Sequence, residues 1–319
     1  MPSSVPASVK PPVCRVVFGG TANGIAPEDP PALQAALEHL AGADHEALLA
    51  ATGAAALKDG VWLFPGRDLS AGFGLARNDL GLDAGTTDLY QRLFAATEGL
   101  QLYRFWNYVP HINTSDDGLE NYRRFCQARS LAFEERFGRQ FERLLPSSTA
   151  VGAAGGPLAA AFVAGPAPAR HFENPAQVPA FSYPTEHGPR SPSFSRATVA
   201  ATAGAIHVFI SGTAAIRGHA TVAPGDLAAQ LECTLDNLRL IAVAAGVGAS
   251  LGAGRSWQRT FKVYLRDPGD LRKVVARLES RLLHPRDHVT YLRADICRAE
   301  LMVEIEASLV RRNFLPTDA

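Results

Sequence analysis

Short apolar runs and alternating apolar and polar positions recur along this chain, and such patterns predict β-strands. The strands that we expect lie at residues 13–18, 61–64, 100–109, 149–151, 158–163, 205–212, 261–265, 289–294 and 301–307. Apolar residues at helical spacing predict helices at 31–40, 88–97, 118–144, 224–245 and 267–283. The helix at 118–144 has the strongest pattern of these, and Asp116, Asp117 and Glu120 would stabilise the positive end of its dipole.

The order of these elements lacks the regular strand–helix alternation of a doubly wound parallel sheet. It favours an α+β fold with helices packed on one face of each sheet. Seven prolines and few periodic apolar positions mark residues 165–192 as a linker or a long surface loop. We therefore expect an N-terminal α+β domain at 1–164 and a C-terminal domain at 193–319 that contains the last strand. No GxGxxG or P-loop sequence is present, so no nucleotide cofactor is expected.

The charge balance excludes some classes of partner. Lys+Arg and Asp+Glu both number 31, and the formal net charge is +0. A chain without excess positive charge is not expected to bind nucleic acid or an anionic membrane surface. The four cysteines are far apart and the nine histidines are scattered, so no metal site is expected. Residues 1–12 lack the apolar core of a signal peptide, and no apolar run is long enough to span a bilayer, which predicts a cytoplasmic protein.

The expected last strand contains the most informative residues. Alternation places Glu304 and Glu306 on one face of the strand and its apolar residues on the other. The pattern alone favours the simpler interpretation, in which both carboxylates face solvent. If Glu304 instead lies partly buried beside a pocket, desolvation would raise its pKa and allow it to donate a proton near neutral pH.

Further candidates surround that strand. Cys297, which follows Arg293 and precedes Arg298, is interpreted as a pocket-lining residue and not as a covalent catalyst. The small residues after the strand at 205–212 allow a ligand to approach the backbone, although a tight turn or bulge without a ligand explains them equally well. These small residues are Ser211, Gly212, Thr213 and Ala214.

Arginines could hold an anionic ligand, because a guanidinium donates a matched pair of hydrogen bonds to a carboxylate. Arg196 lies in a segment rich in serine and arginine. Tyr122 and Arg129 are seven residues apart and therefore share one face of the predicted long helix. Most arginines on such a helix are solvated, so we expect at most one or two of them to reach a ligand.

Longer motifs resemble a known family. Residues 104–113 (RFWNYVPHIN), residues 118–122 (GLENY) through to Arg129, and residues 294–298 (ADICR) are similar to the chorismatases. The C-terminal half, about 181–310, resembles the reactive-intermediate-deaminase (RidA/YjgF) superfamily in the segments FISGTA at 209–214, VYL at 263–265 and VEIEA at 303–307. The resemblance implies two RidA/YjgF-like (chorismate-mutase-like) α+β halves in one chain, with mixed sheets.

The resemblance also implies an activity. Chorismatases remove pyruvate from chorismate without a cofactor, by protonating the enolpyruvyl group, and their catalytic glutamate falls on Glu304. Because chorismate has two carboxylates, Arg129 and Arg196 are the first candidates to bind them, with Tyr122, Arg293 and the small residues at 211–214 as further pocket residues. Cysteine and glycine at two pocket positions, here Cys297 and Gly212, are typical of the type that forms 3-hydroxybenzoate, in some members together with 4-hydroxybenzoate.

Alternatives stay open at this stage. They are a hydrolytic chorismatase that yields a dihydroxycyclohexadiene carboxylate, an imine deaminase of the RidA type, and a ligand-binding protein without activity. The carboxylate-binding arginine of the simple deaminases aligns with Val289, while Arg293 lies four residues later, which weakens the deaminase hypothesis. Two halves in one chain can form a ligand site internally, so we expect a monomer that acts on a small molecule.

Overall fold

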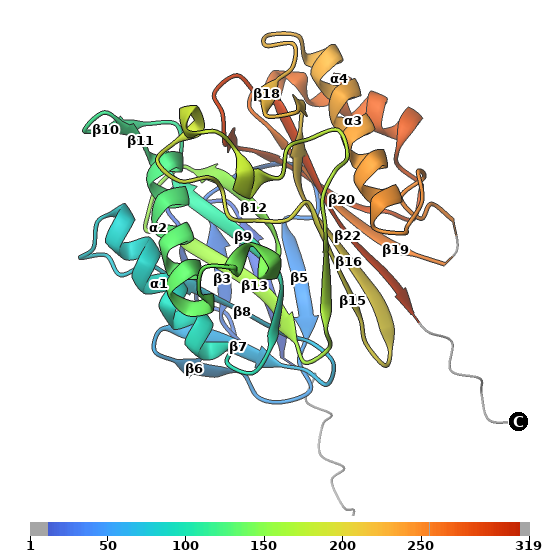
Figure 1. Ribbon diagram of the computed structural model, residues 1–319. Helices are drawn as coiled ribbons and strands as arrows, with labels where there is room; N and C mark the ends of the chain where they lie inside the picture. The colour runs from blue at the N-terminus through green and yellow to red at the C-terminus, as the bar shows by residue number, and fades with distance from the viewer. Residues whose placement is uncertain (1–11, 255, 313–319) are drawn as a thin grey trace, which may run out of the picture.

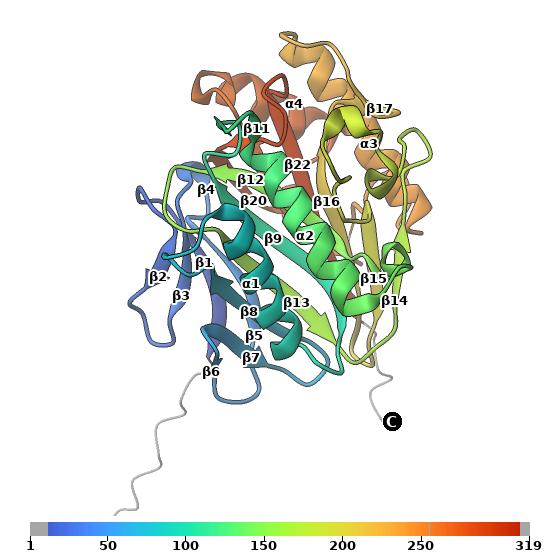
Figure 2. The same ribbon diagram turned by 60° about the vertical axis from the view of Figure 1, so that its left-hand side comes forward.

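Two seven-stranded β-sheets face one another in the computed structural model, which describes residues 12–254 and 256–312 (Figure 1). Helices cover the outer face of each sheet, so the layers run helix, sheet, sheet, helix (Figure 2). Aromatic and aliphatic side chains from the inner faces, among them Trp106, Phe209 and Tyr264, form the core between the sheets. The predicted α+β class with mixed sheets is confirmed.

The first large sheet is built mainly from the N-terminal half. Its strands, in spatial order, are β21 (Asp295–Ile296), β12 (Ser147–Ala153), β9 (Gln101–Pro110), β13 (Ala159–Gly165), β8 (Ser70–Leu75), β7 (Val61–Pro65) and β6 (Ala56–Lys58). The helices α1 (Leu82–Ala96) and α2 (Asn121–Phe137) pack on its outer face through an aromatic cluster that includes Tyr90, Phe105 and Phe133.

The second large sheet is built mainly from the C-terminal half. Its strands are β14 (Ala169–Phe172), β15 (Ala197–Ala201), β16 (Ala205–Ala214), β22 (Val303–Arg312), β19 (Gln258–Leu265), β20 (His288–Arg293) and β4 (Glu38–Gly42). The helices α3 (Leu227–Ala244) and α4 (Leu271–Arg281) cover its outer face. Leu231, Leu238 and Leu278 from these helices pack against Val303 and Ile305 of β22.

Shorter elements complete the chain. A four-stranded sheet has the order β2 (Gly24–Ala26), β3 (Ala32–Ala35), β1 (Val13–Phe18) and β5 (His45–Ala50). Two hairpins pair β10 (Ser115–Asp116) with β11 (Leu119–Glu120) and β17 (Ile216–Arg217) with β18 (Ala220–Thr221). The 3₁₀ turns are η1 (Phe141–Leu144), η2 (Ala180–Ser182), η3 (Thr185–His187) and η4 (Pro268–Asp270).

Each large sheet contains one strand from the other half of the chain. The N-terminal strand β4 pairs antiparallel with β20 at the edge of the second sheet. The short C-terminal strand β21 pairs antiparallel with β12 in the first sheet. The two halves of the chain are thereby joined by backbone hydrogen bonds as well as by the core between the sheets, while domain boundaries at 164 and 193 stay predictions.

The helix predicted at 31–40 is wrong, since these residues form β3 and most of β4. Alanine and leucine suit a helix, but β3 pairs with β1 and β4 pairs with β20, and pairing with distant strands overrides local preference. The predicted helix at 118–144 begins later, at Asn121, because the hairpin β10–β11 includes Asp116 and Glu120. It ends at Phe137 before Gly138, which has φ of 78°.

Candidate active site

The two halves of the chain enclose a cavity of about 630 Å³ between the inner edges of the large sheets, beside α2. Residues from both halves of the chain line it. They include Tyr122 and Arg129 of α2, Ser148 and Thr149 of β12, Tyr183 and Arg196 of the segment between η2 and β15, Gly212 and Ala214 of β16, and Cys297, Arg298 and Glu304 near β22. A volume of this size accommodates a small organic molecule.

Glu304 reaches this cavity because of a local irregularity in the sheet. The register between β16 and β22 shifts between Ile210 and Thr213, which is a β-bulge. Gly212 lies in the bulge, and a Cβ atom added there would be only 2.8 Å from the carboxyl carbon of Glu304. The absent side chain therefore provides the space that the glutamate occupies, and Glu304 is only 4% exposed.

The carboxyl group of Glu304 is a weak acid in this environment. Burial is the main cause that raises its pKa to about 8, and the negative charge of Glu306 adds to the rise. Arg104 and Arg196 act in the opposite direction and limit the rise. Among the residues that the structure describes, none donates a hydrogen bond to the side-chain carboxyl group of Glu304. The group is thus mostly protonated at neutral pH and can act as a general acid.

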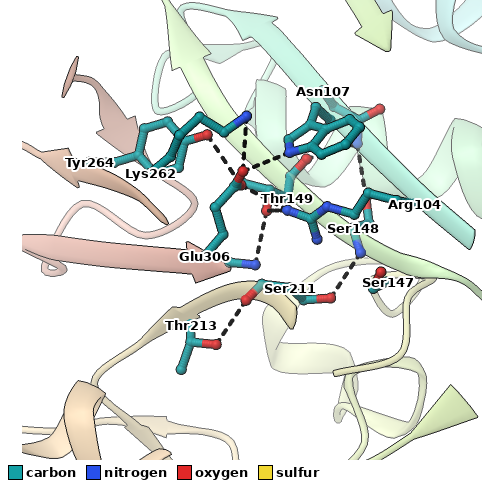
Figure 3. A network of polar contacts seen from close by, with 12 residues as sticks. Arg104, Asn107, Ser147, Ser148, Thr149, Ser211, Thr213, Lys262, Tyr264 and Glu306 are labelled. Carbon is teal, nitrogen blue, oxygen red and sulfur yellow. Dashed lines mark hydrogen bonds and ion pairs between the residues drawn. The ribbon is translucent and has the colours of Figure 1, made fainter. Parts of the chain in front are cut away.

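Glu306, two residues along the same strand, has the opposite protonation state. Burial opposes its ionisation, but the adjacent Lys262 and Arg104 outweigh burial and lower its pKa. Its carboxylate oxygens lie 2.9 Å from Nζ of Lys262 and 2.8 Å from Nη2 of Arg104. The indole of Trp106 and the hydroxyl of Tyr264 also donate to it, at 2.6 and 3.2 Å (Figure 3). Glu306 is therefore a fixed anion that helps to keep Glu304 protonated.

Thr149 of β12 links this anion to the bulge. Its hydroxyl oxygen accepts hydrogen bonds from Nη2 of Arg104 at 2.5 Å and from the backbone N–H of Gly212 at 2.9 Å. Figure 3 shows Thr149 between Arg104 and the strand that contains Glu306. The chain from Glu306 through Arg104 and Thr149 to Gly212 holds the bulge against the first sheet, and so it fixes the place of Glu304.

Two buried arginines supply positive charge to the cavity. Arg129 donates from Nε to the hydroxyl of Tyr90 at 2.7 Å and from Nη1 to the carbonyl of Ser193, while its Nη2 has no hydrogen-bond partner among the described residues. Arg196 donates to the hydroxyl of Tyr183 at 2.7 Å, and its Nε forms an ion pair with a carboxylate oxygen of Glu173 at 3.9 Å. Unpaired guanidinium N–H groups beside a cavity are suited to bind an anion.

The thiol of Cys297 also lines the cavity and is not activated. Burial, followed by the charge of Glu304, raises its pKa to about 12, so the thiolate is scarce at neutral pH. Burial likewise raises the pKa of the neighbouring Tyr122 well above its ordinary value. Both side chains are neutral at neutral pH, which fits a role in shaping the cavity.

Most of the predicted site residues meet at this cavity. Glu304, Cys297, Arg129, Tyr122, Arg196, Gly212 and Ala214 line it. Three others do not line it, because their side chains have different partners. Ser211 donates to the carbonyl of Ser195 at 2.6 Å, and Thr213 donates to the carbonyl of Ser211 at 2.8 Å. Arg293 points to Asp295 at 3.2 Å. These three residues support the bulge or the sheet edge.

The sequence patterns missed other lining residues. Ser148, Thr149, Tyr183, Phe194 and Arg298 lie at the cavity without having been predicted there. Tyr183 lies in the proline-rich stretch at 165–192, whose composition indicated only a loop, and Phe194 follows it. For Thr149, the available signal was the strand predicted at 149–151.

Similarity to known proteins identifies the family of this chain. A chorismatase of Streptomyces rapamycinicus is 40% identical over 247 residues, which are 73% of this chain and 73% of that relative. The chain belongs to the chorismatase family. Residues 38–164 match the family described as "Chorismatase FkbO/Hyg5-like, N-terminal". A solved chorismatase structure is 31% identical with a TM-score of 0.80, covering 96% of this chain and 95% of that chain.

Another chorismatase-family relative has a more specific name. A 3-hydroxybenzoate synthase of Streptomyces hygroscopicus is 38% identical over 214 residues, which are 64% of this chain. The chain spans 62% of the length of that relative in this match. Within the described residues of this chorismatase-family protein, we find no helix with the length and apolar character required to cross a membrane.

Proposed function

We propose that this protein is a chorismatase that converts chorismate to 3-hydroxybenzoate and pyruvate, with Glu304 as the general acid. The observation that supports this most is the protonated carboxyl group of Glu304, whose pKa is raised to about 8, at a cavity that two buried arginines also line. An enol ether is cleaved after protonation of its terminal carbon, which requires an acid that is still protonated near neutral pH.

The proposed reaction begins with transfer of the Glu304 proton to the CH₂ carbon of the enolpyruvyl group. The π electrons of the double bond form the new C–H bond, and the ether carbon becomes an oxocarbenium ion. Glu304 is left as a carboxylate, which the positive charges of Arg104 and Arg196 favour. These cations therefore lower the energy of the charge that develops on the acid during the step.

Two outcomes can follow. In the intramolecular route, pyruvate leaves with the electron pair of the ring C–O bond. The oxygen of the adjacent ring hydroxyl then bonds to the carbon that pyruvate has left, its bond to its original carbon breaks, and the ring loses one proton as it becomes aromatic with the hydroxyl at position 3. Hydroxybenzoate and pyruvate then contain all the atoms of chorismate, and the released proton balances the one that Glu304 delivered. In the hydrolytic route, one water molecule adds and the ring keeps two hydroxyl groups. Cys297 and Gly212 at the cavity, and the similarity to a 3-hydroxybenzoate synthase, support the intramolecular route.

Arg129 and Arg196 are proposed to bind the two carboxylates of the substrate. Both are buried and line the cavity. Nη2 of Arg129 has no hydrogen-bond partner in the described structure, whereas Nε of Arg196 is already ion-paired with Glu173 at 3.9 Å. The aromatic rings around Arg129, with Phe133 4.8 Å away from its Cζ, hold that guanidinium in place without consuming its donors. The proposed chemistry uses only these side chains and needs no cofactor.

The proposal includes a monomer that works in the cytoplasm. The cavity is lined by both halves of one chain, so no residue of a second copy is needed to build the site. All four cysteines are free thiols, which suits a reducing compartment.

One experiment tests the proposal directly. Purified protein is incubated with chorismate, pyruvate is followed with lactate dehydrogenase, and the aromatic products are separated by chromatography. Equal amounts of pyruvate and 3-hydroxybenzoate are expected. A dihydroxycyclohexadiene carboxylate in place of 3-hydroxybenzoate would assign the hydrolytic route, and absence of pyruvate at micromolar enzyme would overturn the proposal.

A further inference from the structure

Two histidines and a glutamate meet beside the cavity, outside the machinery described above. Glu186 and His187 belong to η3, and His219 lies in the turn of the hairpin β17–β18. Glu186 and His187 line the cavity. The hairpin turn is held next to this segment by backbone hydrogen bonds between Gly218 and residues 176 and 178, both of 2.9 Å. The cluster thus joins two separate parts of the chain.

We propose that Glu186, His187 and His219 form a binding site for a divalent transition-metal ion such as Zn²⁺, at the mouth of the cavity. Nε2 of His187, Nδ1 of His219 and Oε1 of Glu186 are the three ligand atoms, and they lie close to one another. Their side chains are 20%, 39% and 64% exposed, respectively, so the site is open to solvent on one side. Imidazole nitrogens and a carboxylate oxygen are the ligands that zinc takes in sites with an open fourth position.

The spacing of the ligand atoms supports the proposal. The three separations are 3.0 Å between the histidine nitrogens, 3.3 Å from Glu186 to His219 and 3.4 Å from Glu186 to His187. Bonds of about 2.0–2.1 Å in a tetrahedral arrangement place neighbouring ligand atoms about 3.3–3.4 Å apart. The three atoms therefore already approximate one face of a zinc tetrahedron, and binding requires shifts of only a few tenths of an ångström.

The two imidazoles share one hydrogen, and this arrangement is compatible with metal binding. In the 3.0 Å contact, one histidine nitrogen carries the shared hydrogen. Binding requires that ring to adopt its other tautomer, which moves the hydrogen to the second ring nitrogen without net loss of a proton. Glu186 supplies negative charge that partly offsets the cation and the nearby arginines.

The consequence for turnover rests on the proposed function, whereas metal binding does not. A bound ion would place positive charge and one free coordination position where an anionic substrate enters and an anionic product leaves. Carboxylates are zinc ligands, so the ion would retain them at the mouth of the cavity. The site is therefore expected to be inhibitory, and it is separate from the reaction, which needs no metal.

Calorimetric titration of the full-length protein with Zn²⁺ tests the site. One saturable site is expected, with Mg²⁺ giving no comparable signal because that ion prefers oxygen ligands. His187→Ala and His219→Ala should each weaken zinc binding by about tenfold or more, since each removes one of three ligands. His288→Ala, which removes an exposed histidine far along the chain, should bind zinc like the wild type.

Thiols could also bind zinc, so Cys297→Ala belongs in the same series. The proposal would be overturned if His187→Ala and His219→Ala kept the zinc affinity of the wild type while Cys297→Ala lost it. Absence of saturable binding to the wild type would overturn it as well. The activity arm compares chorismate turnover with and without Zn²⁺ within each variant, and inhibition should be strong in the wild type and weak in His219→Ala. If no protein turns over chorismate, the proposed function fails while the binding data still decide the site.

Discussion

Gly212 lies directly against the carboxyl group of Glu304, and the two residues occupy neighbouring strands at a β-bulge. A Cβ at position 212 would be 2.8 Å from the carboxyl carbon of Glu304 and 3.1 Å from Cγ2 of Thr149. The nearest obstacle is the end of a flexible side chain and not the backbone. A substitution at this glycine should therefore displace the proposed acid without preventing folding.

Gly212→Ala is expected to lower kcat by about a hundredfold, because displacement of a catalytic group by about 1 Å has effects of this size. The thermal midpoint should change little, since the carboxyl group can move aside. Gly24→Ala is a matched control, as a Cβ at Gly24 meets nothing within 4 Å and φ there is not positive. Measurement of pyruvate release and thermal unfolding on both variants checks this. Full activity of Gly212→Ala would contradict the prediction, because it would show that the Glu304 carboxyl group does not need the space beside Gly212.

The pH dependence of kcat/KM should show one limb from Glu304. The acid must be protonated in the free enzyme, and burial raises its pKa to about 8. We therefore expect kcat/KM to be level across neutral pH and to fall tenfold per pH unit above about pH 8. A limb near pH 4 to 5 instead would mean that a carboxyl group with an ordinary pKa limits the reaction. Initial rates in overlapping buffers of constant ionic strength provide the measurement.

Glu304→Gln should lose turnover and gain stability. The amide cannot deliver a proton, so pyruvate release should stop while chorismate still binds in calorimetry. In the wild type, the folded-state pKa of Glu304 is above its unfolded value of 4.5, so stability is lost as pH rises from about 4.5 towards 8. At pH 7 this amounts to about 3 kcal/mol, which the neutral amide avoids.

The stability difference between Glu304→Gln and the wild type should accordingly grow between pH 5 and pH 8. Urea unfolding at several pH values measures it. An equal difference at all pH values would contradict a buried, uncharged Glu304. Glu279→Gln, at an exposed glutamate of α4, is the matched control and should track the wild type.

The sequence pattern predicted which face of the last strand carries Glu304 and Glu306, and the structure confirms that alternation. It did not predict their burial, because the first sheet, which covers them, contributes Arg104, Trp106 and Thr149 from about two hundred residues or less away along the chain. A one-sided sheet with solvent on its polar face has the same pattern. Only the family resemblance indicated that this face is enclosed.

Other elements show the same limit. The aromatic strand β9 and the helices α1, α3 and α4 were predicted because their apolar residues repeat with a clear period. The helix predicted at 31–40 failed because β4 is stabilised by pairing with β20, about 250 residues later. Long-range pairing of this kind has no local pattern.

Arg196→Lys should weaken substrate use while leaving the acid unchanged. Lysine keeps the positive charge that Glu304 experiences, but it loses the planar pair of donors that matches a carboxylate. Loss of a charge-assisted hydrogen bond predicts a fall in kcat/KM of roughly ten- to a hundredfold, mostly through KM. The control is Arg170→Lys, an exposed arginine on β14. A changed kcat with an unchanged KM would indicate that Arg196 acts on the chemical step and not on binding.

Cys297→Ala should change which product forms more than how fast pyruvate is released. The thiol is neutral, with its pKa raised to about 12 by burial, and it lines the cavity together with Glu304. A neutral side chain of this kind shapes the space around the ring, and alanine leaves room in which a water molecule can attack. We expect the share of dihydroxycyclohexadiene carboxylate to rise at the expense of 3-hydroxybenzoate, while pyruvate release stays within about tenfold of the wild type.

Chromatography measures the ratio of the two aromatic-route and hydrolytic-route products in samples that have released equal amounts of pyruvate. Complete loss of pyruvate release in Cys297→Ala, with the fold intact, would assign the thiol a direct part in protonation.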